Sequence, residues 1–126
     1  MKKDITSRKD IELIISKFYK KLLADKDMLP FFEEIVKSNH LEAHIDTITN
    51  FWEDILLYTS NYSSNVMQKH LDFDKKVKFT KEHFSIWVNY LSVTIHDNYE
   101  GQNAQNMKDR ASSIAMVMQV KFKLYD

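Results

Sequence analysis

Two histidines four residues apart, His40 and His44, could share a metal ion. Residues at that spacing lie on one face of a helix, and two imidazole nitrogens placed there can bind zinc. The zinc-peptidase motif, however, has its glutamate directly after the first histidine, whereas Glu42 is one position later and points to another side of the helix. No cysteine or further spaced acidic residue completes the set. A helical zinc-binding protein using His40 and His44 is therefore the alternative hypothesis.

His70 is the more informative histidine because of where it lies. Asn65 can cap a short predicted helix over 66–71, with a polar loop before it and an irregular basic stretch after it. A histidine on such a short helix can hold its ring at a fixed height over a cofactor. Spacing alone does not decide for this function, since a surface or capping histidine fits the same pattern.

Tyr19 and Trp87 are the two side chains that could donate hydrogen bonds inside an apolar core. Tyr19 lies at the edge of the apolar face of the first predicted helix, and Trp87 lies on the buried face of a later one. The alternatives are an interfacial tyrosine with its hydroxyl in water and a tryptophan that only packs. A role for either residue requires a partner in space.

Long helices must position these residues, because the chain has one Gly and one Pro and turn-rich sheet proteins need more. Thr6 or Ser7 can start the first helix, Pro30 suits the first turn of a short helix over 30–36, and Thr80 can cap a later long helix. Gly101 is placed to end a helix or turn the chain. The apolar stripes at helical spacing predict the buried faces, which comprise Ile11, Ile14, Ile15, Phe18, Leu22 and Leu23, then Leu41 to Leu56, then Phe84, Trp87, Val88, Leu91 and Ile95, then Ala104 to Phe122.

Composition limits the class of protein. The length of 126 residues predicts one domain, 1–126. The 18 basic and 18 acidic residues cancel, so we expect neither nucleic acid nor a membrane surface as partner. The absence of cysteine excludes disulfides and covalent haem attachment through Cys-x-x-Cys-His. The first residues lack the apolar run of a signal peptide, and we expect a soluble cytoplasmic protein.

Five motifs in order give the sequence a family resemblance. They are Phe18-Tyr19, Leu29-Pro30-Phe31-Phe32, His44 with Phe51-Trp52, Lys69-His70-Leu71, and His83-Phe84-Ser85-Ile86-Trp87. Together they resemble the group III truncated haemoglobins over nearly the whole chain, from about Ile11 to Phe122. The chain also lacks the Gly-Gly pairs that the other two groups carry at helix ends, which agrees with the third group.

The resemblance implies an all-α fold, a two-over-two helical sandwich around one non-covalent haem b. It gives His70 the place of the proximal iron ligand and puts Tyr19, His44, Ile48 and Trp87 at distal positions. Phe32 falls where a side chain packs on the haem plane, and Trp52 matches a bulky core aromatic. No motif fixes the residues that pair with the haem propionates, for which Lys69, Lys81 and His83 are candidates. The loop 61–65 has Ser where relatives often have Gly.

The implied chemistry is the binding of dioxygen and other diatomic ligands opposite His70. Donors from Tyr19 and Trp87 would stabilise the partial negative charge of bound dioxygen and slow its release, with His44 as a gate. Retention suits conversion of nitric oxide to nitrate, or peroxide reduction, better than bulk transport. Enzymatic activity of either kind would need electrons from a reductase. A helical interaction module without haem is a third hypothesis, against which the presence of His70, Tyr19 and Trp87 argues.

Overall fold

The computed structural model describes residues 2–59 and 80–121, and within these ranges all regular structure is helical. The elements are α1 (Arg8–Ala24), the 3₁₀ helix η1 (Leu29–Phe31), α2 (Glu33–Lys37), α3 (Leu41–Leu57), α5 (Lys81–Asn98) and α6 (Gln102–Lys121). The predicted all-α class is confirmed. None of the described helices combines the length and apolarity that crossing a membrane requires.

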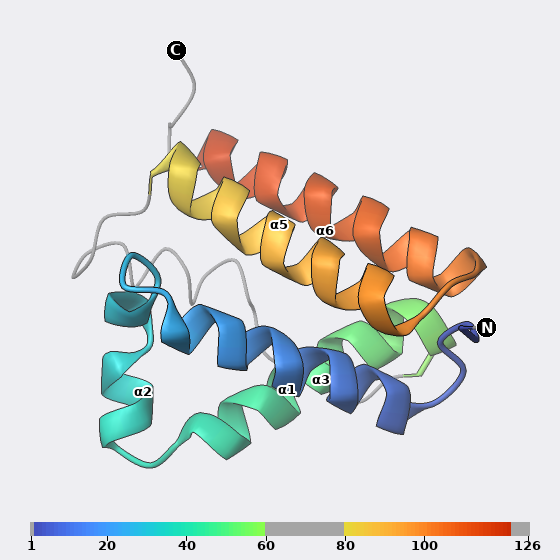
Figure 1. The fold of residues 1–126 in the computed structure, drawn as a ribbon, viewed down its shortest axis with the longest axis horizontal. Coiled ribbons are helices and arrows are strands. Elements are labelled where there is room, and N and C mark those ends of the chain that lie inside the picture. The colour runs from blue at the N-terminus through green and yellow to red at the C-terminus, as the bar shows by residue number, and fades with distance from the viewer. Residues whose placement is uncertain (1, 60–79, 122–126) are drawn as a thin grey trace.

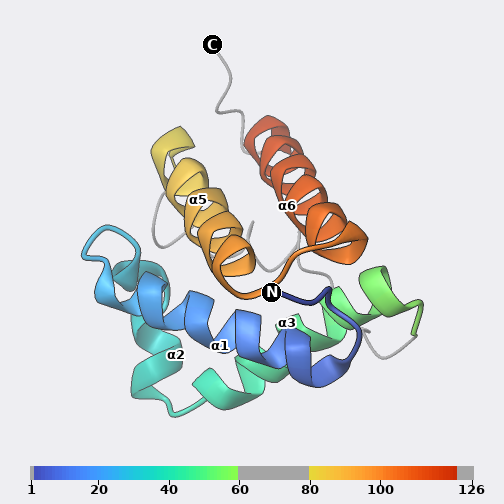
Figure 2. The same cartoon turned by 45° about the vertical axis from the view of Figure 1, so that its right-hand side comes forward.

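The long helices form two layers of two. Figure 1 shows α5 and α6 running side by side as one pair, with α1 and α3 forming the other. In the rotated view of Figure 2 the two pairs lie one above the other, with α1 next to α5. α1 packs against both α3 and α5 and is therefore the central helix of the described chain. This is the predicted two-over-two sandwich.

Two of the long helices begin at the predicted caps. Ser7 caps α1 in a capping box with Asp10, and Thr80 caps α5 in a capping box with His83. Each box satisfies backbone N–H groups that the first turn leaves without partners. The beginnings of α1 and α5, and so the rotational phase of Tyr19 and Trp87, are fixed by local sequence.

The predicted short helix over 30–36 is wrong as a single element. The structure divides it into η1 and α2 at Phe32. The Phe32 N–H bonds back to the Leu29 carbonyl at 2.9 Å, the tighter three-residue closure of a 3₁₀ turn. Pro30 fits the start of this turn because it has no N–H to satisfy. The following α2 ends before Asn39, which adopts a left-handed conformation with φ 63°.

The predicted apolar stripes form most of the core. Tyr19 is also buried, at 5% exposed, although the sequence places it only at the edge of the stripe. Leu23, Trp87 and Val88 are half-buried rather than buried, and Phe122 lies outside the described residues. The fully buried large side chains include Ile11, Ile14, Ile15, Phe18 and Leu22 of α1, Trp52 of α3, Leu91 and Ile95 of α5, and Met107 of α6.

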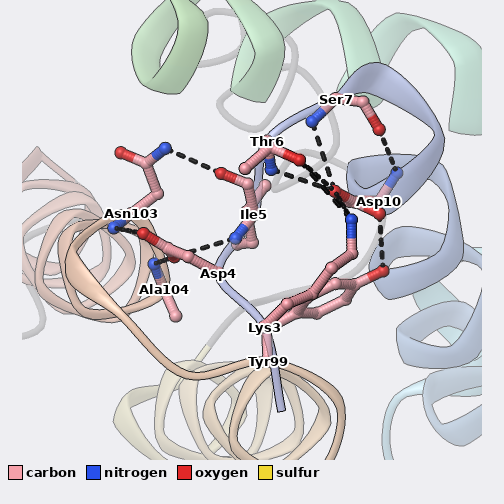
Figure 3. A network of polar contacts seen from close by, with 9 residues as sticks. All are labelled: Lys3, Asp4, Ile5, Thr6, Ser7, Asp10, Tyr99, Asn103 and Ala104. Atoms are coloured by element: carbon pink, nitrogen blue, oxygen red, sulfur yellow. Dashed lines mark hydrogen bonds and ion pairs between the residues drawn. The ribbon is translucent and has the colours of Figure 1, made fainter.

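The segment before α1 is fastened to the beginning of α6, far from it in the sequence (Figure 3). The Asp4 carboxylate accepts hydrogen bonds from the backbone N–H groups of Asn103 and Ala104, both at 2.9 Å, and so caps α6 from a distance. Gly101 turns the chain as predicted, with φ 145°. A Cβ at Gly101 would lie 2.7 Å from Asp4 Oδ2, so glycine permits this cap.

A second carboxylate, Asp10, lies beside this cap and is 7% exposed. It accepts from the Thr6 N–H, from Lys3 Nζ at 3.0 Å and from the Tyr99 hydroxyl at 3.1 Å (Figure 3). Burial acts to raise the pKa of Asp10, but these hydrogen bonds and the Lys3 charge outweigh it and lower the pKa well below its ordinary value. The carboxylate is therefore ionised, and it joins the N-terminal segment to α1 and to the end of α5.

Candidate functional site

A hydrogen bond between α1 and α3 marks the candidate site. The Tyr19 hydroxyl lies 2.8 Å from His44 Nε2. Burial raises the pKa of the Tyr19 hydroxyl far above its ordinary value, so it stays protonated throughout the physiological range. The pair is thus a phenol with one proton facing an imidazole nitrogen that either accepts or donates, according to its tautomer.

Aromatic rings enclose this pair. The Phe32 ring meets the Tyr19 ring edge-on, with centroids 5.4 Å apart and planes at 90°. The His44 ring lies 5.3 Å from the Tyr19 ring and 6.3 Å from the Phe32 ring. The structure therefore brings together Tyr19, His44 and Phe32, three of the predicted site residues, from three segments of the chain. Apolar neighbours lower the local dielectric and strengthen any hydrogen bond made there.

Trp87 reaches this group through Phe18. The Phe18 ring lies 5.9 Å from the Trp87 ring in an edge contact and 5.4 Å from the Tyr19 ring. Trp87 is half-buried, and its indole N–H has no hydrogen-bond acceptor among the described residues. Among the described residues, the Trp87 N–H is therefore a donor that a bound molecule could use.

Several large apolar side chains of the described helices are only partly buried. Ile48, one of the predicted site residues, belongs to this set, which packs against the core without being enclosed by it. The members on the long helices are Ile45, Ile48, Phe51, Ile55 and Leu57 of α3, Ile86, Trp87 and Tyr90 of α5, and Ile114 of α6. Trp52, in contrast, is 2% exposed and is a core residue, as predicted.

His83 has a structural role of its own. Its Nδ1 accepts from the Thr80 N–H at 3.0 Å, and its ring packs edge-on against Phe31 at 4.7 Å. Lys81 is exposed at the first position of α5. His70, Lys69, the cap at Asn65 and the loop 61–65 lie outside the described residues.

The described residues give no support to the zinc alternative. They contain no group of three or more His, Cys, Asp or Glu side chains that could hold a metal ion. His40 is the exposed N-cap residue of α3, and its Nδ1 lies 3.0 Å from Ser38 Oγ. His44 Nε2 is directed instead at Tyr19.

Phe18 is the residue near the site whose role sequence reasoning underestimated. Its place in the apolar stripe predicts a core residue, which is confirmed, but not its contacts with both Tyr19 and Trp87. Helical spacing assigns a residue to a face, whereas the neighbour it meets depends on how two helices cross. No signal in one sequence reports that crossing.

Comparison with known proteins agrees with this geometry. No family profile matches the chain. A curated relative, the group 3 truncated hemoglobin ctb of Campylobacter jejuni, is 29% identical over 117 residues, which cover 91% of this chain and 90% of the relative. The crystal structure of group III truncated hemoglobin from Campylobacter jejuni superposes with a TM-score of 0.86 at 28% identity, covering 100% of this chain and 97% of that one. Sequence and fold together identify the chain as a homologue of the group III truncated haemoglobins.

Proposed function

We propose that this chain is a haem-binding globin that takes dioxygen and other diatomic ligands. The observation that carries the proposal is the hydrogen bond between buried Tyr19 and half-buried His44, on a fold similar to that of truncated haemoglobins. The Trp87 N–H, which has no acceptor among the described residues, adds a second donor. Bound haem iron would supply a coordination position for a diatomic gas.

The described residues fit such a cofactor. A flat apolar ring system would cover the partly buried side chains of α3, α5 and α6, Ile48 among them, and Phe32 would pack on its plane. The free donor of Trp87 would gain an acceptor. A solvated polar surface would instead be expected to offer charged side chains at these positions.

The tautomer of His44 determines what Tyr19 can do. The phenol has one proton, so it can donate to a ligand and keep its bond to His44 only by accepting from a protonated Nε2. With the other tautomer, Tyr19 is committed to His44 until that ring turns away. His44 thus controls both access and the availability of the Tyr19 proton. Tyr19 and Trp87 together would hold a ligand that carries partial negative charge.

We propose His70 as the axial iron ligand and a non-covalent haem b, on the family resemblance and on the absence of cysteine. Lys69, Lys81 and His83 are the candidates to pair with the propionates. The two donors, Tyr19 and Trp87, favour slow ligand release. Slow release suits conversion of nitric oxide to nitrate, or peroxide reduction, better than bulk transport, and either reaction would need a reductase partner. We further propose one domain, 1–126, that works in the cytoplasm without nucleic acid or membrane partners.

The absorption spectrum of the purified protein tests the proposal. We expect a Soret band, and a haem b spectrum after extraction in alkaline pyridine. His70→Ala should lose most of the haem, whereas His96→Ala, at an exposed position of α5, should keep it. A colourless protein from haem-sufficient cells that holds stoichiometric zinc, lost in His44→Ala, would overturn the proposal in favour of the zinc alternative.

A further inference from the structure

Three hydrogen bonds join α1 to α5 at a regular step. The pairs are Lys17 with Asn98 at 2.9 Å, Lys21 with Thr94 at 2.9 Å, and Asp25 with Tyr90 at 2.6 Å. Each pair lies four residues further along α1 and four residues back along α5, as in an antiparallel arrangement. Because four residues make about one helical turn, the three pairs form a row along the seam, which we call the polar ladder.

The α5 side of the polar ladder is held in place by its own helix. The Thr94 hydroxyl donates to the Tyr90 carbonyl at 2.7 Å, and Asn98 Nδ2 donates to the Thr94 carbonyl at 2.7 Å. Thr94 is 0% exposed, so the Lys21 ammonium reaches a fully buried acceptor. A long flexible lysine directed at a buried hydroxyl indicates a fixed contact rather than a solvated charge.

The polar ladder continues toward the candidate site. Trp87 precedes Tyr90 by three residues and Thr94 by seven, and these spacings place all three on one face of α5. Phe18, which contacts Trp87, follows Lys17 on α1, and Tyr19 comes next. Any sliding of α1 along α5 therefore changes the separation between the Tyr19 hydroxyl and the Trp87 indole.

We propose that the polar ladder fixes the register of α1 against α5 and thereby positions Tyr19 relative to Trp87. Apolar packing between these helices is not directional and does not define one axial position. Hydrogen bonds weaken steeply when their angle departs from linear, so three in a row define one. Thr94 and Tyr90 are thus positioning residues. Their effect on ligand binding rests on the proposed function.

Thr94→Val tests the proposal, and the chain offers a matched control. Thr49 is also 0% exposed and its hydroxyl also donates to the carbonyl four residues earlier, at 2.8 Å, but both partners are within α3. Thr94→Val and Thr49→Val therefore remove the same group from equally buried helical positions, and only Thr94→Val removes a rung. Tyr90→Phe removes a second rung from a half-buried side chain and serves if Thr94→Val does not fold.

Three readouts distinguish a change of helix register from a change of stability alone. In the haem-loaded protein, Thr94→Val with Tyr90→Phe should speed release of a diatomic ligand by about threefold to tenfold, the loss of part or all of one aligned hydrogen bond. It should also shift the stretching frequency of bound carbon monoxide. Thr49→Val should leave both unchanged. Nuclear Overhauser contacts between the Phe18 and Trp87 rings should weaken only in the ladder variants.

Unchanged ring contacts in the ladder variants would overturn the proposal, as would equal changes in Thr49→Val. If the wild-type protein binds no haem, the proposed function fails, and the ring contacts alone decide whether the ladder fixes the register. Suppose that haem binds and the ring contacts weaken, but ligand release does not change. The ladder then fixes the register, and the proposal that it positions the two donors for the ligand is wrong.

Discussion

At the scale of single residues, the candidate site has two hydrogen-bond donors that differ in whether they already have an acceptor. Tyr19 is enclosed and already bonded to His44, whereas the Trp87 N–H has no acceptor within the described residues. A ligand that accepts from Trp87 gains a hydrogen bond without breaking one among the described residues, whereas a ligand that accepts from Tyr19 replaces the bond to His44 wherever the phenol is its donor. The two donors therefore differ in whether ligand binding breaks an existing hydrogen bond.

Removing the donors one at a time measures what each contributes to holding the ligand. Tyr19→Phe and Trp87→Phe keep a ring but delete the proton, and each should speed dioxygen dissociation by about tenfold for one lost bond of ~1.4 kcal/mol. Because one donor can substitute for the other, the double variant should be faster than either. Stopped-flow release is the measurement. A double variant that releases dioxygen at the wild-type rate would exclude both residues as stabilising groups.

His44→Leu should act mainly on association. The substitution removes the ring that bonds to Tyr19 and leaves the phenol proton free. We expect ligand association to change by several-fold, with dissociation no faster than in the wild type because Tyr19 can then donate at all times. Flash photolysis measures the association rate. Rapid release in His44→Leu would mean that His44, not Tyr19, holds the ligand.

At the scale of elements, the long helices differ in whether their first turns are capped by neighbouring residues or by a residue distant in the sequence. The beginnings of α1 and α5 are capped by residues adjacent in sequence, Ser7 and Thr80. The beginning of α6 is capped by Asp4, which is far away in the sequence. Gly101 makes that cap possible, since it has positive φ and no side chain beside the carboxylate.

Gly101→Ala should therefore be costly. The added Cβ would overlap Asp4, and φ 145° is strained for any L residue, so the free energy of unfolding should fall by more than about 1 kcal/mol. Chemical denaturation provides the value. In an Asp4→Gly background the side-chain atoms that the added Cβ would overlap are all absent, so the penalty should shrink to the backbone strain alone. Gln102→Ala, exposed at the start of α6, is the control. Additive effects of Gly101→Ala and Asp4→Gly would contradict the proposed overlap.

The sequence predicted what is local and periodic. The caps Ser7 and Thr80 and the apolar faces of α1 and α5 follow from residue types and spacing within one helix. The break at Phe32 was missed because propensity does not separate a 3₁₀ turn from an α-helical one. The grouping of Tyr19, His44 and Phe32 came from the family resemblance. The polar ladder and the Asp4 cap could not be predicted, because nothing in a single sequence pairs residues so far apart.

At the scale of the whole molecule, a buried charge contributes to stability. Asp10 joins the N-terminal segment, α1 and the end of α5, and its pKa is lowered by hydrogen bonds that outweigh the effect of burial. The Tyr99 hydroxyl donates a hydrogen bond to Asp10, and burial together with the Asp10 carboxylate raises the pKa of Tyr99 to about 12. Both shifts favour the ionised carboxylate beside the neutral phenol over the whole neutral range.

The sign of the Asp10 shift predicts acid sensitivity. Its folded pKa is below its unfolded value of about 4, so its stabilisation is complete above that value and is lost as the pH falls toward the folded pKa. The free energy of unfolding should decline below about pH 5, by up to about 1.4 kcal/mol per pH unit for one proton. Asp10→Asn should be less stable at pH 7 and show a shallower decline. Asp97→Asn, exposed on α5, should keep the wild-type slope; an unchanged slope in Asp10→Asn would refute the assignment.

The fastening of the N-terminal segment to α6 also bears on how the protein is made. Asp4 meets its partners 99 and 100 residues later in the chain. At roughly 5–20 residues per second, a ribosome would need about 5–20 seconds to deliver them. During that interval Asp4 has no helix to cap, and closing so long a loop costs entropy that local contacts do not repay. We therefore expect the nascent chain to reach its native state only when α6 emerges.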